Sequence, residues 1–129
     1  MIKKKVKTQK KKIENKFIRL AELSLTDFLT RSEDELLRFF TTTPQHWIML
    51  HKVVIAYYKN ETISKNQLLK FIERSYLTSN TYVDTAIKKD YFKIIRNNED
   101  KRSIFILPSE ETLKKFEKFI MQRENLYKL

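Results

Sequence analysis

Residues 63–108 decide the fold, and they read ISKNQLLKFIERSYLTSNTYVDTAIKKDYFKIIRNNEDKRSIFILP. Apolar residues recur at helical spacing in the first half, which predicts a short helix over residues 63–75 with Ser64 as its N-cap. A second helix is expected to open at Thr78 or Ser79. Its core-facing positions would be Tyr82, Val83, Ala86 and Ile87.

The periodicity changes from helical to two-residue alternation between Lys89 and Pro108. Residues 91–96 alternate as a strand does, a charged segment follows at 97–102, and residues 104–107 form an apolar return strand that Pro108 stops. Two short helices, a tight joint and two strands around a polar hairpin tip are the order of a winged helix-turn-helix. The predicted fold class is therefore mainly α with a small antiparallel β-wing.

Helices are also expected on both sides of this unit. Apolar residues at steps of three and four predict an amphipathic helix over Ile13–Leu29, and Ser32 with Glu35 forms a capping box ahead of a short second helix. Thr43 and Pro44 open a third helix that ends near Asn60. Ser109 caps a last helix, Glu110–Leu126. We expect one winged-helix domain over residues 13–129 and a basic tail at residues 1–12 that is flexible or a frayed helix end.

Charge narrows the class of partner. The formal net charge is +11 and the pI is near 9.8, which favours a polyanionic partner. Residues 1–16 hold eight Lys and one Glu, so seven of the eleven net charges lie there. An anionic membrane surface is the weaker alternative because this segment has few apolar residues. With no Cys, no apolar run of about 20 residues and no secretory signal pattern, we expect a cytoplasmic protein without a membrane partner.

The segment TSNTYVDTAIKKDYFKIIRNNEDKRSIFILPSEETLKKFEKF, residues 78–119, resembles the recognition helix, wing and following helix of the multiple-antibiotic-resistance regulator (MarR) type of bacterial transcription factor. Asp100, Lys101 and Arg102 match the Asp-x-Arg wing of that family, and residues 107–109 match its strand exit. Asp90 stands where the family has a joint glycine, and Asp tolerates the left-handed conformation. The resemblance implies a homodimer with paired recognition helices in successive major grooves.

The resemblance also places the dimer contacts on the terminal helices. Their apolar stripes would meet across a twofold axis. The dimerisation residues expected on this basis are Phe17, Leu20, Leu113, Phe116 and Ile120.

The second helix of the stretch offers candidates for reading DNA. If its apolar positions face the core, its short polar residues face outward. Asn can bond adenine through two hydrogen bonds, and Thr can reach base edges or pack its methyl group against thymine, so Asn80, Thr81 and Thr85 are the direct-readout candidates. The alternative for the first turn is simple helix capping. The residues expected to contact DNA on this helix are Ser79, Asn80, Thr81, Thr85 and Lys88.

The wing adds Lys101 and Arg102 at a hairpin tip, where an arginine can enter a narrow minor groove. The alternative is a solvated turn in which Asp100 and Arg102 pair for little free energy. Other cations would contact phosphates or steer the duplex without reading sequence. These are Lys65, Lys70, Arg74, Lys88, Lys89, Lys93 and Arg96.

Catalytic and cofactor patterns are not found in the sequence. His46 and His51 are five residues apart and do not share a helix face, so we expect no metal, no cofactor and no enzymatic activity. Trp47, Tyr57, Tyr58 and Phe71 are expected to pack in the core or a dimer interface. A small aromatic effector near Trp47 and Tyr57 is the less favoured interpretation.

These observations predict a sequence-specific, double-stranded DNA-binding transcriptional regulator that acts as a homodimer, with one helix in the major groove and the wing at the minor groove. Two alternatives remain. One is a winged-helix protein-interaction or assembly module, because the body beyond Phe17 is only mildly basic. The other is a nonspecific nucleic-acid binder driven by the lysine tail.

Overall fold

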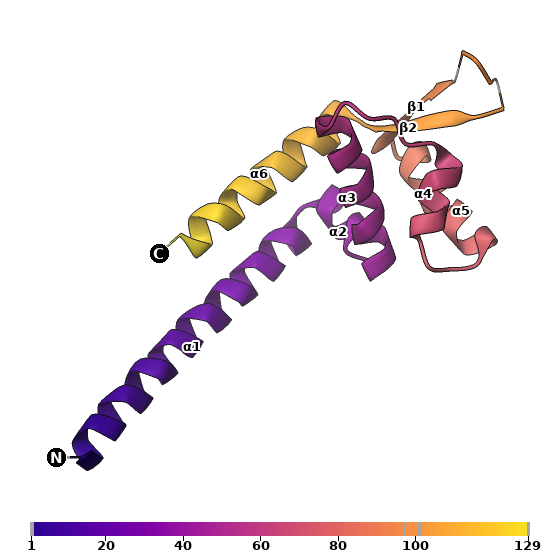
Figure 1. Ribbon diagram of the computed structural model, residues 1–129. Coiled ribbons are helices and arrows are strands. Elements are labelled where there is room, and N and C mark those ends of the chain that lie inside the picture. Colours follow the sequence, from indigo (N-terminus) through magenta and orange to yellow (C-terminus); the bar gives the residue numbers. More distant parts are fainter. Residues whose placement is uncertain (1, 97, 101, 129) are drawn as a thin grey trace.

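The computed structural model describes residues 2–96, 98–100 and 102–128, with side chains from Gln9 onward. Figure 1 shows a mainly helical chain with one two-stranded antiparallel sheet, which confirms the predicted fold class. The elements are α1 (Ile2–Glu33), α2 (Glu35–Phe40), α3 (Pro44–Tyr58), α4 (Lys65–Phe71), α5 (Tyr76–Lys88), β1 (Phe92–Arg96), β2 (Ile104–Pro108) and α6 (Glu110–Tyr127).

Local capping sets most helix starts. The side chains of Thr43, Ser64 and Ser109 each accept a hydrogen bond from the backbone N–H three residues on, as the sequence predicts. The predicted cap of α2 was wrong. Ser32 instead donates its hydroxyl to the Phe28 carbonyl inside α1, and Asp34 caps α2 by accepting from the Leu37 N–H.

The first helix begins eleven residues earlier than expected. The structure continues α1 through the lysine run to Ile2, whereas the sequence analysis began it at Ile13. Lysine is among the better helix formers, so an exposed run of it is compatible with helix once the following turns are formed. That the run is flexible stays a prediction.

The core lies between α2, α3, α4, α5 and the sheet, and α6 closes one side of it. Phe40, Leu50 and Val83 are fully buried there, and burying a side chain of this size stabilises the fold by about 1.5–3 kcal/mol. Three aromatic residues expected in the core or a dimer interface, Tyr57, Tyr58 and Phe71, are all exposed, so the core is excluded for them and a dimer interface stays a prediction. The buried face of α3 instead follows the spacing 46, 49, 50, 53 and 54.

The wing is a short antiparallel pair in which Phe92 lies opposite Pro108 and Arg96 opposite Ile104. Asp90 joins α5 to β1 with φ of 61°, so the predicted left-handed joint is confirmed. Behind the wing, the Ile106 N–H donates to the Ile63 carbonyl at 2.9 Å. This bond ties the start of α4 to β2 and fixes the sheet against the helices.

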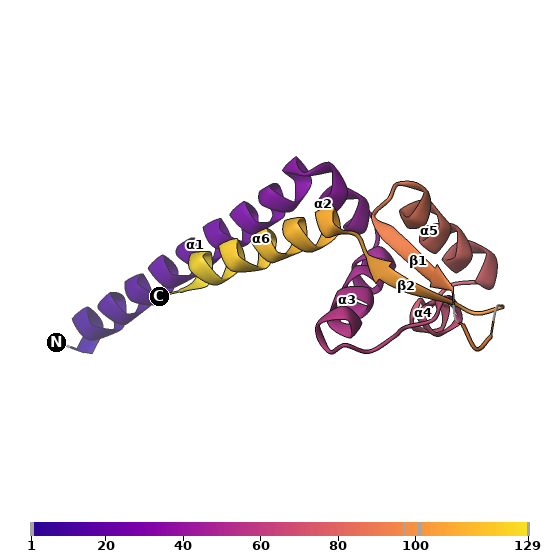
Figure 2. The same ribbon diagram turned by 90° about the horizontal axis from the view of Figure 1, so that it is seen from above.

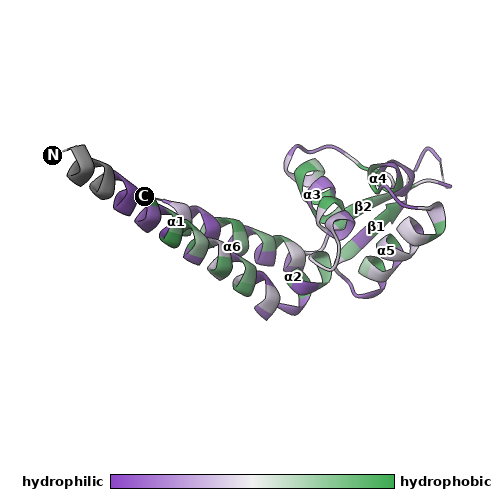
Figure 3. Ribbon diagram, turned by 90° about the horizontal axis from the view of Figure 1, so that it is seen from below, coloured by the Kyte–Doolittle hydropathy of each residue, from purple (hydrophilic) through white to green (hydrophobic). Residues whose placement is uncertain are grey.

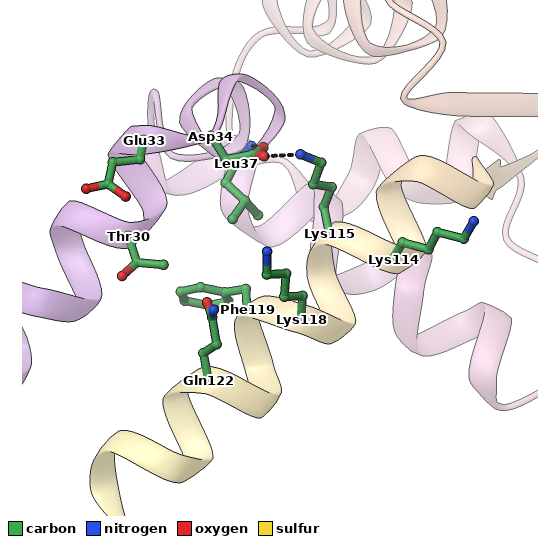
Figure 4. A pocket seen from close by; sticks show the side chains of 9 residues that line it. All are labelled: Thr30, Glu33, Asp34, Leu37, Lys114, Lys115, Lys118, Phe119 and Gln122. Carbon is green, nitrogen blue, oxygen red and sulfur yellow. Dashed lines mark hydrogen bonds and ion pairs between the residues drawn. The ribbon is translucent and has the colours of Figure 1, made fainter.

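The molecule has two parts, a lobe and an arm. The lobe is residues 35–108, from α2 to β2, and the arm is α1 with α6, which lie side by side and project away from the lobe (Figures 1 and 2). At the base of the arm a hollow of about 390 Å³ lies between the end of α1 and α6 (Figure 4). An ion pair between Lys115 and Asp34 spans its edge.

Within the part of the chain that the structure describes, no helix combines the length and apolar character needed to cross a bilayer.

Candidate nucleic-acid interface

An exposed stripe runs the length of α5. Val83 and Ala86 are fully buried, and Tyr82 and Ile87 pack against the core, so the predicted inward face is confirmed. The opposite face is open to solvent over three helical turns. We call these residues the α5 stripe: the exposed Leu77, Thr81, Asp84 and Lys88, with the half-buried Asn80 at its edge.

Ser79 does not belong to this stripe, and the expectation that it faces DNA was wrong. Its side chain is 1% exposed, and its hydroxyl lies 3.4 Å from the carbonyl oxygens of Ile72 and Arg74 at the end of α4. The helix starts at Tyr76, with Ser75 as its cap, so Ser79 falls one turn before Val83 on the buried face. A small hydroxyl at this position fills the joint between α4 and α5.

Side-chain pairing shapes the middle of the stripe. The Asn80 amide donates to Asp84 at 3.0 Å, and the Lys65 ammonium lies 2.6 Å from the other oxygen of the same carboxylate. Asp84 therefore brings little unpaired negative charge to the surface. The Asn80 carbonyl oxygen and second N–H lie outside this bond, and these are the groups that an adenine edge requires.

The two threonines on α5 are held in one orientation. The Thr81 hydroxyl donates to the Leu77 carbonyl at 2.9 Å, and the Thr85 hydroxyl donates to the Thr81 carbonyl at 2.7 Å. Thr81 is exposed and Thr85 is half-buried. Each hydroxyl can still accept a hydrogen bond, but it already donates its proton to a backbone carbonyl of the helix.

At the wing tip, Asp100 organises the loop. Its carboxylate accepts from the Arg102 backbone N–H at 3.0 Å and from the Ser103 hydroxyl at 3.2 Å. The carboxylate thus supports the turn through the backbone, and the Arg102 side chain is exposed. Lys101, the other expected wing contact, lies outside the described residues.

The start of the stripe, in the first turn of α5, and the wing tip lie at the same end of the molecule. Figure 2 shows the first turn of α5 and the hairpin of the wing both at the end furthest from the arm. A helix and a loop placed in this way can contact one duplex together.

The other cations expected to contact phosphates divide into two kinds. Lys65 is paired with Asp84, Lys93 lies 3.1 Å from Asp90, and the Lys89 ammonium lies 5.9 Å from the Phe39 ring centre. A second group is exposed, and no such contact is resolved for it: Lys70, Arg74, Lys88 and Arg96. These four cations are the better candidates for phosphate contacts.

The terminal helices carry apolar residues that the chain itself does not cover. Phe17 is 64% exposed, and Figure 3 shows hydrophobic residues along the arm. Leu20 is half-buried and Ile120 is exposed, but Phe116 is 9% exposed and packs against the His51 ring. The expectation that Phe116 faces a second copy was therefore wrong, and Leu113 also packs against the core.

His46 is a buried residue that the sequence analysis missed. Its ring stacks on Tyr82 with centroids 4.1 Å apart, and its Nδ1 lies 2.8 Å from the Thr43 hydroxyl oxygen. Burial lowers the pKa of His46 below its ordinary value. The helical spacing from His46 to Met49, Leu50 and Val53 is the signal that could have identified it.

Trp47 is packed rather than open. Its ring lies 5.7 Å from the Phe119 ring centre and 4.6 Å from that of His51, and the Arg31 guanidinium lies 5.6 Å above it. Tyr57 lies at the surface, beside Tyr58, whose hydroxyl donates to Glu117. Trp47 therefore fills the junction between the arm and α3.

Ionisable groups at the base of the arm stabilise its attachment to the lobe. Burial alone would raise the pKa of Asp34, but hydrogen bonds from Lys115 and the Leu37 N–H outweigh it and lower the pKa below its ordinary value. Burial, with the hydrogen bond to Glu117, raises the pKa of Tyr58 to about 12. Among residues 9–96, 98–100 and 102–128, no three His, Asp or Glu side chains gather as metal ligands.

Comparisons with known proteins bear on the fold. No family model matches the chain, and no curated protein matches it by sequence. Solved structures do match: the transcriptional regulator Tm0710 from Thermotoga maritima is 20% identical, with 86% of this chain and 75% of that chain covered and a TM-score of 0.56. The S. aureus MepR–DNA complex is 15% identical, with 84% and 86% covered and a TM-score of 0.61.

A third match is the heme sensor protein PefR from Streptococcus agalactiae in complex with heme, 16% identical, with 85% of this chain and 75% of that chain covered and a TM-score of 0.54. The likeness extends over both the arm and the lobe, because more than four fifths of this chain is covered in each case. At this level of identity the likeness concerns the fold. The resemblance to MarR-type winged-helix regulators is confirmed at that level.

Proposed function

We propose that the protein is a homodimeric transcriptional regulator that binds double-stranded DNA in a sequence-specific manner, with α5 in the major groove and the wing at the minor groove. The observation that carries the proposal is the α5 stripe, which faces solvent and starts at the same end of the molecule as the Arg102 wing tip. MepR, one of the proteins with this fold, was solved as a complex with DNA. The net charge of +11 favours the same kind of partner.

Roles within this interface follow from chemistry. The free amide groups of Asn80 and the methyl and hydroxyl of Thr81 suit base edges, whereas exposed Lys88 and Arg96 suit phosphates. Arg102 would enter the minor groove, held by the turn that Asp100 organises. A twofold dimer would present two such units to half-sites about 34 Å apart.

Selection of bound duplexes from a random pool tests this proposal. The expected result is a palindromic consensus whose half-sites are separated by one helical turn, which would establish recognition and symmetry together. Recovery of duplexes without a consensus, with affinity that follows charge alone, would instead favour the nonspecific binder.

A second candidate function has its own observation. Large apolar side chains lie exposed on both α5 and β1, at Leu77, Ile94 and Ile95. Such a surface is also compatible with a protein partner. Absence of any duplex shift at low salt, where phosphate contacts are strongest, would promote this protein-interaction function over the regulator.

The packing of Trp47 bears on the small aromatic effector. Since its ring is enclosed by Phe119, His51 and Arg31, and Tyr57 lies elsewhere at the surface, these two aromatic residues do not line a common site. We therefore assign both to structure and propose no effector for them.

A further inference from the structure

We propose that Leu77 reads thymine by packing against its 5-methyl group in the major groove, so that the first turns of α5 select A·T base pairs. This inference rests on the proposed function and adds to it the base class that the helix recognises. Leu77 was not among the contacts expected from the sequence.

Leu77 is placed where base contacts concentrate. It is the second residue of α5, after the Ser75 cap, and the N-terminal part of a recognition helix usually contacts base edges. Its side chain is 77% exposed, more than any other large apolar side chain described. The helix buries its opposite face in the core, and Leu77 is not among the described residues that form or pack against that core.

The chemistry of the stripe limits what it can read. Residues 76–87 contain neither Lys nor Arg, the side chains that most often bond guanine. Asp84, which could accept from cytosine, is already paired with Lys65 and Asn80. Two possibilities remain on these turns, adenine through the Asn80 amide and thymine through an apolar contact.

Thymine is the base that presents an apolar group in the major groove. Leu77 lies one helical turn before Thr81, and the Thr81 hydroxyl is turned back to the Leu77 carbonyl. These two residues therefore offer neighbouring carbon surfaces on one face of the helix. Tyr76 is also exposed, at 70% against 77% for Leu77, and it lies one helical turn before Asn80 rather than before Thr81.

Replacing thymine by deoxyuridine tests the contact, because this change removes only the methyl group. In the selected duplex, each thymine of the half-site is replaced in turn, and binding is measured at fixed salt. Loss of one buried methyl is expected to weaken binding about fourfold per half-site at one thymine position. The Leu77→Ala protein should bind the thymine duplex more weakly and lose this sensitivity to deoxyuridine.

Two further variants serve as controls. Leu77→Met retains an apolar contact and should keep the sensitivity, while Ile55→Ala removes an exposed apolar residue of α3 and should behave as the unaltered protein. Since Leu77 is exposed, its substitution should leave thermal unfolding within a degree or two, which separates a lost contact from a lost fold.

The outcomes separate this inference from the proposed function. A palindromic consensus with no thymine whose methyl matters, or equal deoxyuridine sensitivity in Leu77→Ala and unaltered protein, would overturn the inference and leave the regulator in place. A consensus confined to G·C pairs would do the same. Failure to select any duplex would remove both, and would favour a protein partner for Leu77.

Discussion

Asp90 turns the chain from α5 into the wing at a cost in backbone energy. Its φ of 61° lies in the left-handed region, which disfavours any side chain with a Cβ. We expect Asp90→Gly to raise the free energy of unfolding by about 0.5–1 kcal/mol, since the exposed pair with Lys93 that it removes stabilises little. Thermal or urea unfolding measures this.

Asp90→Ala is the matched control for that substitution. Alanine also removes the carboxylate but keeps the Cβ, so it should destabilise the protein where glycine stabilises it. Equal unfolding midpoints for the two variants would show that the left-handed backbone at residue 90 carries no strain.

Asn80 tests recognition at the same scale. Its amide is oriented by Asp84, and Asn80 is half-buried at the edge of the α5 stripe. Asn80→Ala should cost about 1–3 kcal/mol on the selected duplex and relax the preference at one base pair. Binding titrations on the selected and a scrambled duplex measure both effects.

Neutralising Lys10, Lys11 and Lys12 with Gln gives the contrasting behaviour. These side chains are exposed on α1. Because phosphate contacts do not depend on sequence, the loss of their charge should weaken binding to all duplexes alike and reduce the dependence of binding on salt. If Asn80→Ala weakened selected and scrambled duplexes equally, direct readout by that residue would be excluded.

Among the elements, the features that the sequence could predict are those decided within a few residues. The caps at Thr43, Ser64 and Ser109 each need only one oxygen and the N–H three positions later. The joint at Asp90 likewise depends on what one residue tolerates. These boundaries depend on a few residues and were predicted correctly, whereas the same capping rule failed at Ser32, because the preceding helix continues through that residue.

Features decided by packing were predicted less well. Ser75 and Thr78 can both cap a helix. The sequence analysis placed the start at Thr78 or Ser79, so it did not identify Ser79 as a residue of the buried face of the helix. Tyr57 and Phe71 match a helical apolar stripe, but which stripe faces inward depends on neighbouring elements that the sequence does not place. The same limit applies to Phe116, whose partner His51 belongs to α3.

The contact between α3 and α5 is sensitive to pH through His46. Its ring stacks on Tyr82, and the Thr43 hydroxyl can donate to Nδ1 only while that nitrogen is unprotonated. Because the folded pKa is lowered, the unfolded chain binds more protons below about pH 6.5. The free energy of unfolding should therefore fall as the pH drops below that value, by at most about 1.4 kcal/mol per pH unit, and level off below the folded pKa.

Urea unfolding between pH 7.5 and 4.5 measures this dependence, and His46→Gln is the control because glutamine does not titrate. The contribution of Asp34, whose folded pKa is also lowered, is present above its ordinary pKa and is lost only at lower pH. A slope near pH 6 that persists in His46→Gln would assign the effect to another group.

At the scale of the whole molecule, the lobe and the arm differ in how much apolar surface each buries. The lobe holds most of the core, which α6 completes with Phe116 and Phe119, whereas the arm is two helices of unequal length, 32 and 18 residues. At 1.5 Å per residue α1 extends about 20 Å further than α6. In the described part of the chain, three large apolar side chains on the N-terminal half of α1 are exposed: Ile13, Phe17 and Ile18.

A second copy of the arm would cover these side chains. Substitutions of two phenylalanines distinguish an effect on the proposed dimer from an effect on the stability of the fold. Phe17→Asp places a charge on exposed surface, so we expect a monomer with an unchanged unfolding temperature and weak DNA binding. Phe116→Ala removes a buried ring and should lower the free energy of unfolding by about 3–5 kcal/mol. Sedimentation equilibrium measures the mass of each, and a Phe17→Asp protein that sediments as a dimer would show that the outer turns of α1 are not the contact.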